Sequence, residues 1–305
     1  MFPARRIAVC LGLLALAPLA SGCGRDRAGA VPAAVTVTDD AGRTVALPHP
    51  AHRIVALIPS VNEALLALGA GDRLVARTDY DGEPELARLP SVGGGLTPSI
   101  EWLAARRPDL VVAWPDRGSR AVVARLEGVG VPVYVARVEG MEDGFRTTAN
   151  LGRLLGLPGR ADSLVAALRR RIAAVHGAVA ARPAPSVLYL IGTDPPMAAA
   201  AGTSGTDLLA IANGRNAFAD ARVAAQQISV EEVIRRDPDI VLVAQYEAGD
   251  PLGRLRTLPG WRSLPAVRQG RVFALDPDLF NRPGPRSAEA ARRLAVLLHP
   301  GVVVP

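Results

Sequence analysis

The chain has 305 residues, 49% of them hydrophobic and 21% charged, which is typical of a globular protein long enough for two domains. The net charge is +6 at pH 7, but no lysine is present and the arginines are interleaved with acidic residues. The absence of lysine excludes a Walker A phosphate loop, and 4% aromatic residues give no stacking platform for single-stranded nucleic acid, so we expect no nucleic-acid partner.

The N-terminal segment is typical of a secretory signal. Arg5 and Arg6 precede an apolar run over 7–20, which is too short to span a membrane comfortably. Small residues then lead to Cys23 and resemble a bacterial lipobox, in which the cysteine is acylated; the alternative is an ordinary signal peptide cleaved nearby. Cys10 leaves with the signal, so the mature chain has no pair of cysteines for a disulfide. We expect contact with the membrane through this lipid anchor only.

The first half of the folded chain predicts an α/β layer. Residues 35–45 alternate around a turn and predict a hairpin. Residues 53–58 predict a buried strand that leads directly into a helix ending near Gly69, and Ser60 and Glu63 have the spacing of a capping box at the start of that helix. Further short apolar segments predict parallel strands at 74–76, 110–114 and 131–135.

One long helix is expected between two α/β halves. Residues 161–181 have an uninterrupted helical pattern with one apolar stripe, and prolines follow it. The predicted divisions are a lipoprotein signal peptide at 1–22, a flexible tether at 23–34, an N-terminal α/β lobe at 35–158, a connecting helix at 159–182 and a C-terminal α/β lobe at 183–305.

The second half repeats the α/β pattern. Residues 187–192 predict a strand, and 193–206 predict a loop rich in glycine, proline, alanine and threonine. The remaining expected elements are a helix at 207–212, strands at 240–243 and 271–275, and a final helix at 288–298.

An internal repeat relates the two halves. The segment from Ser99 to Val112 and the segment from Ser229 to Leu242 share one pattern at a constant offset of 130 residues. In both segments a serine caps a short helix, a glutamate occupies the first turn, and Pro-Asp precedes an apolar strand. Duplicated lobes of this kind form a cleft between the carboxyl ends of their strands, where ligands bind.

No catalytic motif is present. None of the histidines at 49, 52, 176 and 299 has a neighbourhood typical of a metal ligand or a catalytic triad. The glycine runs at 93–95 and 202–206 favour loop conformations over phosphate binding. We therefore expect no enzyme, no catalytic residue, no cofactor and no metal site in the protein itself. A nucleotide-binding α/β enzyme and a histidine/carboxylate metal-ion receptor remain the alternatives from other classes.

Several segments together resemble the periplasmic-binding proteins for ferric siderophores, haem and cobalamin. They are residues 53–63, 108–111, 238–241, 259–261, 270–272 and 282–286, together with the long connecting helix. The resemblance implies the class III fold, in which two doubly wound α/β lobes are bridged by one long α-helix. It also implies a monomeric solute-binding protein of the periplasm or cell surface, which delivers a metal chelate to an ABC permease dimer with its ATPase subunits.

Cobalamin receptors are the most similar group, so we expect a cobalamin or another corrinoid, with a ferric siderophore or haem as the alternative. The resemblance implies ligand contacts by Ser60, Asn62, Tyr80, Gly94, Trp114, Pro196, Met197, Asp278, Phe280 and Arg282. Gly94, Met197 and Ala225 replace large aromatic residues of the cobalamin receptors, which predicts a wider cleft.

Two glutamates are expected at the transporter interface. Glu101 and Glu231 are equivalent in the 130-residue repeat, so each would lie on the outer rim of one lobe. In the family that the chain resembles, glutamates at these positions pair with arginines of the two permease subunits. Glu63 and Glu232, each three residues after a serine, are expected only to cap helices.

Overall fold

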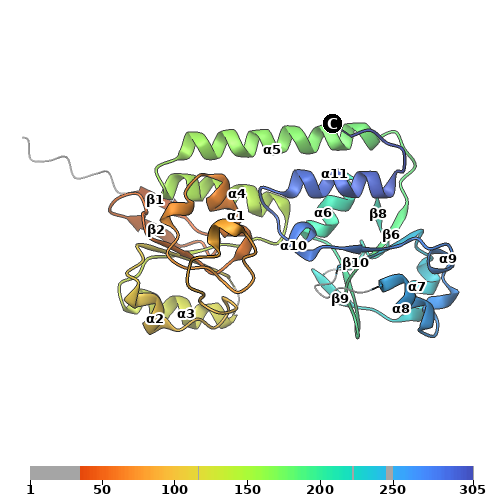
Figure 1. Cartoon of the computed structure of the whole chain (residues 1–305), viewed down its shortest axis with the longest axis horizontal. Coiled ribbons are helices and arrows are strands. Elements are labelled where there is room, and N and C mark those ends of the chain that lie inside the picture. Colours follow the sequence, from red (N-terminus) through yellow and green to blue (C-terminus); the bar gives the residue numbers. More distant parts are fainter. Residues whose placement is uncertain (1–34, 116, 222, 245–249, 305) are drawn as a thin grey trace, which may run out of the picture. The chain divides into compact units, whose positions relative to one another are not determined.

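The computed structural model describes residues 35–115, 117–221, 223–244 and 250–304 (Figure 1). The predicted signal peptide and the lipidation site at Cys23 fall outside the described residues. No helix in the described part of the chain is long and apolar enough to cross a membrane.

The first lobe, defined here as β1 to α4, contains a hairpin and a parallel sheet. The hairpin pairs β1 (Val35–Thr38) with β2 (Thr44–Leu47) antiparallel, as the sequence predicts. The sheet has the order β3-β4-β5, formed by β3 (Ile54–Ala56), β4 (Leu110–Ala113) and β5 (Val133–Val135). The strand expected at 74–76 is reduced to a single bridge between Leu74 and Ile54.

Helices follow the strands of this lobe. They are α1 (Pro59–Ala67), α2 (Ile100–Ala105), α3 (Arg117–Gly128) and α4 (Met141–Leu154), with short 3₁₀ turns at Gly71–Arg73 and Pro84–Leu86. The capping box predicted for the first of them is wrong. Helix α1 begins at Pro59, a residue suited to the first helical position, and its N-cap is Ile58, so Ser60 lies inside the helix and no side chain caps the N-terminus.

The second lobe, defined as β6 to α11, has a mixed sheet of order β11-β10-β6-β7-β9, with β8 also paired to β6. The strands are β6 (Ser186–Thr193), β7 (Pro196–Ala199), β8 (Arg215–Asn216), β9 (Ala225–Gln227), β10 (Ile240–Ala244) and β11 (Val272–Leu275). β10 pairs parallel with β6 and β11, whereas β7 pairs antiparallel with β6 and β9. Part of the expected loop at 193–206 is therefore the strand β7.

The helices of the second lobe are α6 (Ser204–Ile211), α7 (Val230–Arg236), α8 (Pro251–Thr257), α9 (Pro265–Arg268), α10 (Pro277–Phe280) and α11 (Ser287–Leu298), with a 3₁₀ turn at Trp261–Ser263. The helices of the repeat begin alike. The Oγ atoms of Ser99 and Ser229 accept hydrogen bonds from the backbone N–H of Trp102 and Glu232, both at 3.2 Å. The predicted serine caps at these two equivalent helices are confirmed.

Helix α5 (Pro158–Val179) connects the lobes and packs against α4 and α11 (Figure 1). The central strands have apolar side chains on both faces of the sheet, so both faces must be covered by other elements. Alternate residues of β6, such as Val187 and Leu188, enter two different hydrophobic clusters on opposite faces of the sheet. Met141 and Phe145, at the start of α4, pack in one of these second-lobe clusters, so the lobes share part of their core.

Candidate ligand-binding site

A cavity of about 540 Å³ lies between segments of the two lobes. Its first-lobe wall comes from residues that follow the sheet strands: Ser60 after β3, Trp114 after β4 and Val138 after β5. Its second-lobe wall is the segment 281–283, directly after α10. The cavity therefore occupies the carboxyl ends of the parallel strands, where open α/β sheets bind ligands. The lining residues are Ile58, Pro59, Ser60, Tyr80, Gly94, Leu96, Trp114, Val138, Asn281, Arg282 and Pro283.

The walls are mostly apolar and offer flat surfaces. Tyr80 is 58% exposed and Leu96 is 52% exposed, although both are large side chains, whereas Trp114 is half-buried against the first-lobe core. Gly94 lies beside Tyr80, where a Cβ atom would be 3.5 Å from the ring. Neighbouring exposed apolar side chains in a cavity mark a surface suited to a partly apolar ligand.

A smaller cavity of about 230 Å³ shares Val138 and Asn281 with the first. It continues toward the second lobe and is lined there by Ile191 and by Thr203 and Ser204 at the start of α6. The two cavities are therefore neighbours, and hydroxyl groups of Thr203 and Ser204 belong to the lining of the smaller one.

The charged edge of the larger cavity is Arg282. Its Nη2 donates to the backbone carbonyl of Tyr80 at 2.9 Å and pairs with Asp278 at 2.6 Å, while its Nη1 donates to Glu63 at 3.3 Å. Glu63 also accepts two hydrogen bonds from Arg286, at 2.6 and 2.9 Å. Both arginines belong to the second lobe, whereas Glu63 and Tyr80 belong to the first, so this cluster bridges the lobes at the cavity wall.

Burial affects the acidic groups around this cluster. Burial raises the pKa of Glu83, and the negative charges of Glu63 and Asp81 act in the same direction. Burial also raises the pKa of Asp278, although the positive charge of Arg282 opposes this shift. For Arg286, the hydrogen bonds to Glu63 raise the pKa.

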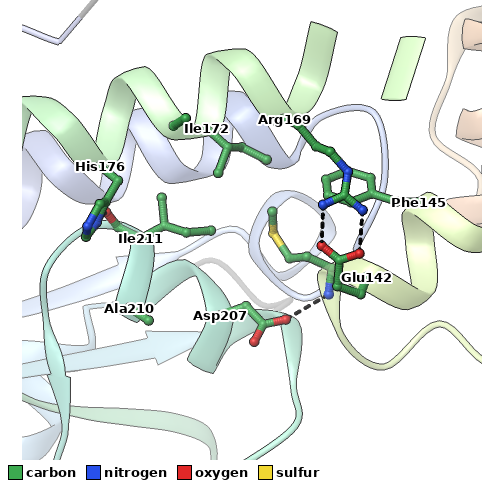
Figure 2. A pocket seen from close by; sticks show the side chains of 10 residues that line it. Glu142, Phe145, Arg169, Ile172, His176, Asp207, Ala210 and Ile211 are labelled. Carbon is green, nitrogen blue, oxygen red and sulfur yellow. Dashed lines mark hydrogen bonds and ion pairs between the residues drawn. The ribbon is translucent and has the colours of Figure 1, made fainter. Parts of the chain in front are cut away.

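A separate cavity of about 460 Å³ lies among α4, α5 and α6, as Figure 2 shows. Its polar groups are largely engaged with one another. Arg169 makes two hydrogen bonds to Glu142, at 2.7 and 2.5 Å, and Asp207 accepts a hydrogen bond from the backbone N–H of Met141 at 2.8 Å (Figure 2). The Asp207 contact connects α6 of the second lobe with the first turn of α4, so we assign it to the attachment between the lobes.

Five of the ten expected ligand residues line the larger cavity: Ser60, Tyr80, Gly94, Trp114 and Arg282. Pro196 and Met197 instead lie on β7 and are absent from the linings of both cleft cavities. Asp278 is also absent from the linings of both cavities, but it forms an ion pair with Arg282, which lines the larger one.

Two expected ligand residues are packed inside the protein. Phe280 is only 5% exposed and belongs to the hydrophobic cluster that includes Leu294 and Leu298 of α11. Asn62 is fully buried; its side chain donates to the carbonyl of Ala56 at 3.2 Å and to Asp81 at 2.8 Å. Both side chains are therefore buried in this structure, and their expected contacts with the ligand remain predictions.

Sequence reasoning missed Glu63, Arg286 and the cavity residues Leu96, Val138 and Asn281. A signal for Glu63 was present, since this glutamate lies among the apolar residues Val61, Ala64 and Leu65 of one helix. A charge at an apolar position of a helix indicates a buried ion pair more strongly than a cap.

The glutamates expected at the transporter are on the surface. The Glu101 side chain is 79% exposed and pairs with Arg125 at 3.0 Å. Hydrogen bonds from its own backbone N–H and from Ser99 lower the pKa of Glu101, so it is charged at neutral pH. Glu231 is exposed and forms no ion pair with any described residue.

Metal ligands do not gather anywhere in the described residues, where no group of three histidine, cysteine, aspartate or glutamate side chains could hold a metal ion. His49 and His52 are exposed, while His299 is buried against the carbonyl of Ala212 at 2.8 Å.

The known proteins to which this chain is similar, in sequence and in structure, are ligand-binding proteins. A model of the periplasmic binding protein family matches residues 54–279. A vitamin B12-binding protein of Vibrio cholerae is 27% identical over 83% of this chain and 91% of its own. An uncharacterized ABC transporter substrate-binding lipoprotein of Bacillus subtilis is 25% identical over 97% of this chain and 98% of its own. Among solved structures, a periplasmic heme-binding protein from Roseiflexus sp. RS-1 has a TM-score of 0.74 and 30% identity, and the match covers 81% of this chain and 97% of that one.

Proposed function

Because the chain belongs to the periplasmic binding protein family, we propose that it captures a metal-chelate nutrient in the cleft between its lobes and delivers it to an ABC importer. The observation that carries this proposal is the cavity of about 540 Å³, whose apolar walls end at one charged group, Arg282. A few polar groups in an apolar cavity fix the orientation of a ligand without holding it covalently.

We propose a corrinoid as the first candidate ligand. Tyr80 and Trp114 offer flat apolar faces to a macrocycle, and Arg282 can meet polar groups at its edge. The adjoining cavity of about 230 Å³ gives room for a substituent that extends toward the second lobe. The vitamin B12-binding relative supports this choice of ligand.

Haem is the second candidate, because one observation favours it. Tyr80 is 58% exposed at the cavity, and a tyrosine oxygen is an established axial ligand of haem iron. Arg282, at the same edge, could then pair with a haem carboxylate. The heme-binding structural relative is consistent with this alternative.

The test is an absorption spectrum of the purified protein, followed by calorimetry with cyanocobalamin, hemin and a ferric hydroxamate. We expect one of these to bind with a Kd of about 1 μM or tighter, and Trp114→Ala to weaken that binding at least about tenfold. The matched control is Trp102→Ala, because Trp102 stacks with Arg106 on α2 and does not line the cavity. Tight binding of Zn²⁺ alone, or equal effects of the two tryptophan variants, would contradict the proposal.

We further propose that the protein acts as a monomer tethered to the membrane by lipid on Cys23 and that it leaves its ligand chemically unchanged. The lipoprotein relative supports the anchor. Cell fractionation of Cys23→Ala tests it: the variant should leave the membrane fraction, and retention there would contradict the anchor. Sedimentation of the purified protein checks the monomer, and recovery of intact ligand after incubation checks the absence of catalysis.

A further inference from the structure

Glu63 is placed to control the shape of the ligand cavity, although it does not line it. Its side chain is 4% exposed and accepts hydrogen bonds from Arg282 and Arg286 across the boundary between the lobes. Arg286 contacts both carboxylate oxygens, through Nε at 2.9 Å and Nη2 at 2.6 Å, and therefore fixes the plane of the carboxylate.

The carboxylate of Glu63 in turn directs Arg282. The Arg282 guanidinium forms an ion pair with Asp278 of its own lobe at 2.6 Å and donates hydrogen bonds to two acceptors of the first lobe, Glu63 and the carbonyl of Tyr80. Because the guanidinium is planar and rigid, its direction follows from the acceptors that hold it. With Glu63 neutralised, the charge of Asp278 is the strongest remaining attraction and draws the group toward the second lobe.

Movement of Arg282 would affect Tyr80 as well. The hydrogen bond from Arg282 to the Tyr80 carbonyl, at 2.9 Å, joins the two cavity walls directly. The Tyr80 side chain is 58% exposed, and this hydrogen bond to its backbone joins the loop to the second lobe. Arg282 and Tyr80 both line the cavity, and the positions of both depend on the buried carboxylate of Glu63, which is not part of the lining.

We propose that Glu63 is the positioning residue of the binding site: it holds Arg282 against Tyr80 and thereby sets the distance between the two walls that enclose the ligand. This inference rests on the proposed function, since it assigns a role within the same site. Removal of one partner from a buried charge pair leaves the other charges uncompensated and accelerates dissociation across an interface.

The experiment compares Glu63→Gln with Glu289→Gln in the full chain, solubilised in detergent. Glu289 is a matched control because it also holds two arginines, Arg292 at 2.9 Å and Arg293 at 2.7 Å, but within the single helix α11 and away from the cleft. Calorimetry and stopped-flow dissociation use cyanocobalamin and hemin as probes. Hydrogen–deuterium exchange of residues 78–96 and 276–286 gives a readout that needs no ligand.

We expect Glu63→Gln to bind the probe at least about tenfold more weakly, through faster dissociation, and to exchange faster in both segments, while Glu289→Gln matches the native chain. Unchanged affinity, unchanged exchange in both segments, or an equal loss in the control would overturn the proposal.

If Glu63→Gln does not fold, Glu63→Asp takes its place, because the shorter side chain keeps the buried charge but draws the carboxylate away from Arg282, which donates to it at 3.3 Å. Faster exchange in both segments supports the proposal, and native exchange overturns it. If neither probe binds the native chain, the proposed ligand is wrong, whereas the exchange experiment still decides whether Glu63 positions the two walls.

Discussion

At the scale of single residues, Asp207 shows how a buried acid can limit stability while holding the lobes together. Its carboxylate accepts the N–H of Met141 at 2.8 Å, but burial raises its pKa above the ordinary 3.8, and Asp143 and Glu142 add to the shift. The folded state therefore prefers the protonated acid. The associated stability is complete below pH 3.8 and is lost as the pH rises through the folded-state pKa.

We therefore expect Asp207→Asn to raise the free energy of unfolding at pH 7, because the amide oxygen still accepts the Met141 N–H without a buried charge. The gain should shrink toward zero at pH 3, where the native acid is itself protonated. Urea unfolding at the two pH values measures it. A variant that is less stable at pH 7 would show that the charge strengthens the hydrogen bond by more than its burial costs.

The ion pairs of Glu63 could not be predicted from the local sequence pattern around it. A serine with a glutamate three positions later predicts a capping box, and Ser60 and Glu63 have that spacing. In the structure Glu63 pairs instead with arginines 219 and 223 residues away in the sequence. Local spacing describes only the neighbours within one turn of helix, so a partner from the other lobe cannot be read from it.

At the scale of elements, two glycines in helices have opposite surroundings. A Cβ atom on Gly144 of α4 would be 2.9 Å from the carbonyl oxygen of Pro283, in the segment that lines the cavity. A Cβ atom on Gly177 of α5 would meet no other atom within 4 Å. Helix α4 thus approaches the second lobe closely only because residue 144 has no side chain.

Gly144→Ala is expected to lower the free energy of unfolding by about 1–2 kcal/mol, because the added methyl group pushes α4 away from Pro283. Gly177→Ala is expected to raise it by about 0.5–1 kcal/mol, since alanine restricts the unfolded chain without meeting other atoms. Denaturant unfolding of both variants checks the contrast. If both substitutions stabilise, the close contact between α4 and the second lobe is not maintained in solution.

At the scale of the whole molecule, we propose that the two exposed glutamates, Glu101 and Glu231, offer a matched pair of charges to a permease dimer. Glu101 and Glu231 lie in the first turns of equivalent helices, α2 and α7, one in each lobe, and both are exposed. Charges in such positions guide the encounter and register of two proteins more than their final affinity.

We expect Glu101→Ala combined with Glu231→Ala to reduce uptake of the ligand by cells at least about tenfold, with ligand affinity and Tm near native. Glu232→Ala is the control, because Glu232 pairs with Arg236 at 2.7 Å within α7. Glu63, which looked like a second control in the sequence, is unsuitable because it bridges the lobes. Native uptake by the double variant, or a loss explained by unfolding, would remove the docking role.

The sequence by itself determined the architecture. Wholly apolar strands, the 130-residue repeat and one uninterrupted helix depend on contacts that recur along the chain at short and regular spacing, and such periodicity is visible in one dimension. It located most of the strands, the serine caps of α2 and α7, and the connecting helix at Pro158–Val179 to within a few residues.

The resemblance named Tyr80, Trp114 and Arg282 as ligand contacts, but only the tertiary structure showed that Leu96, Val138 and Asn281 enclose the cavity with them. Tyr80, Trp114 and Arg282 come from three loops far apart in the sequence, and their common position depends on how the strand ends of both lobes meet. The same packing turned Phe280 into the core and Asn62 toward Asp81. Side-chain direction after a strand depends on the neighbours it meets in three dimensions, and these are absent from any local pattern.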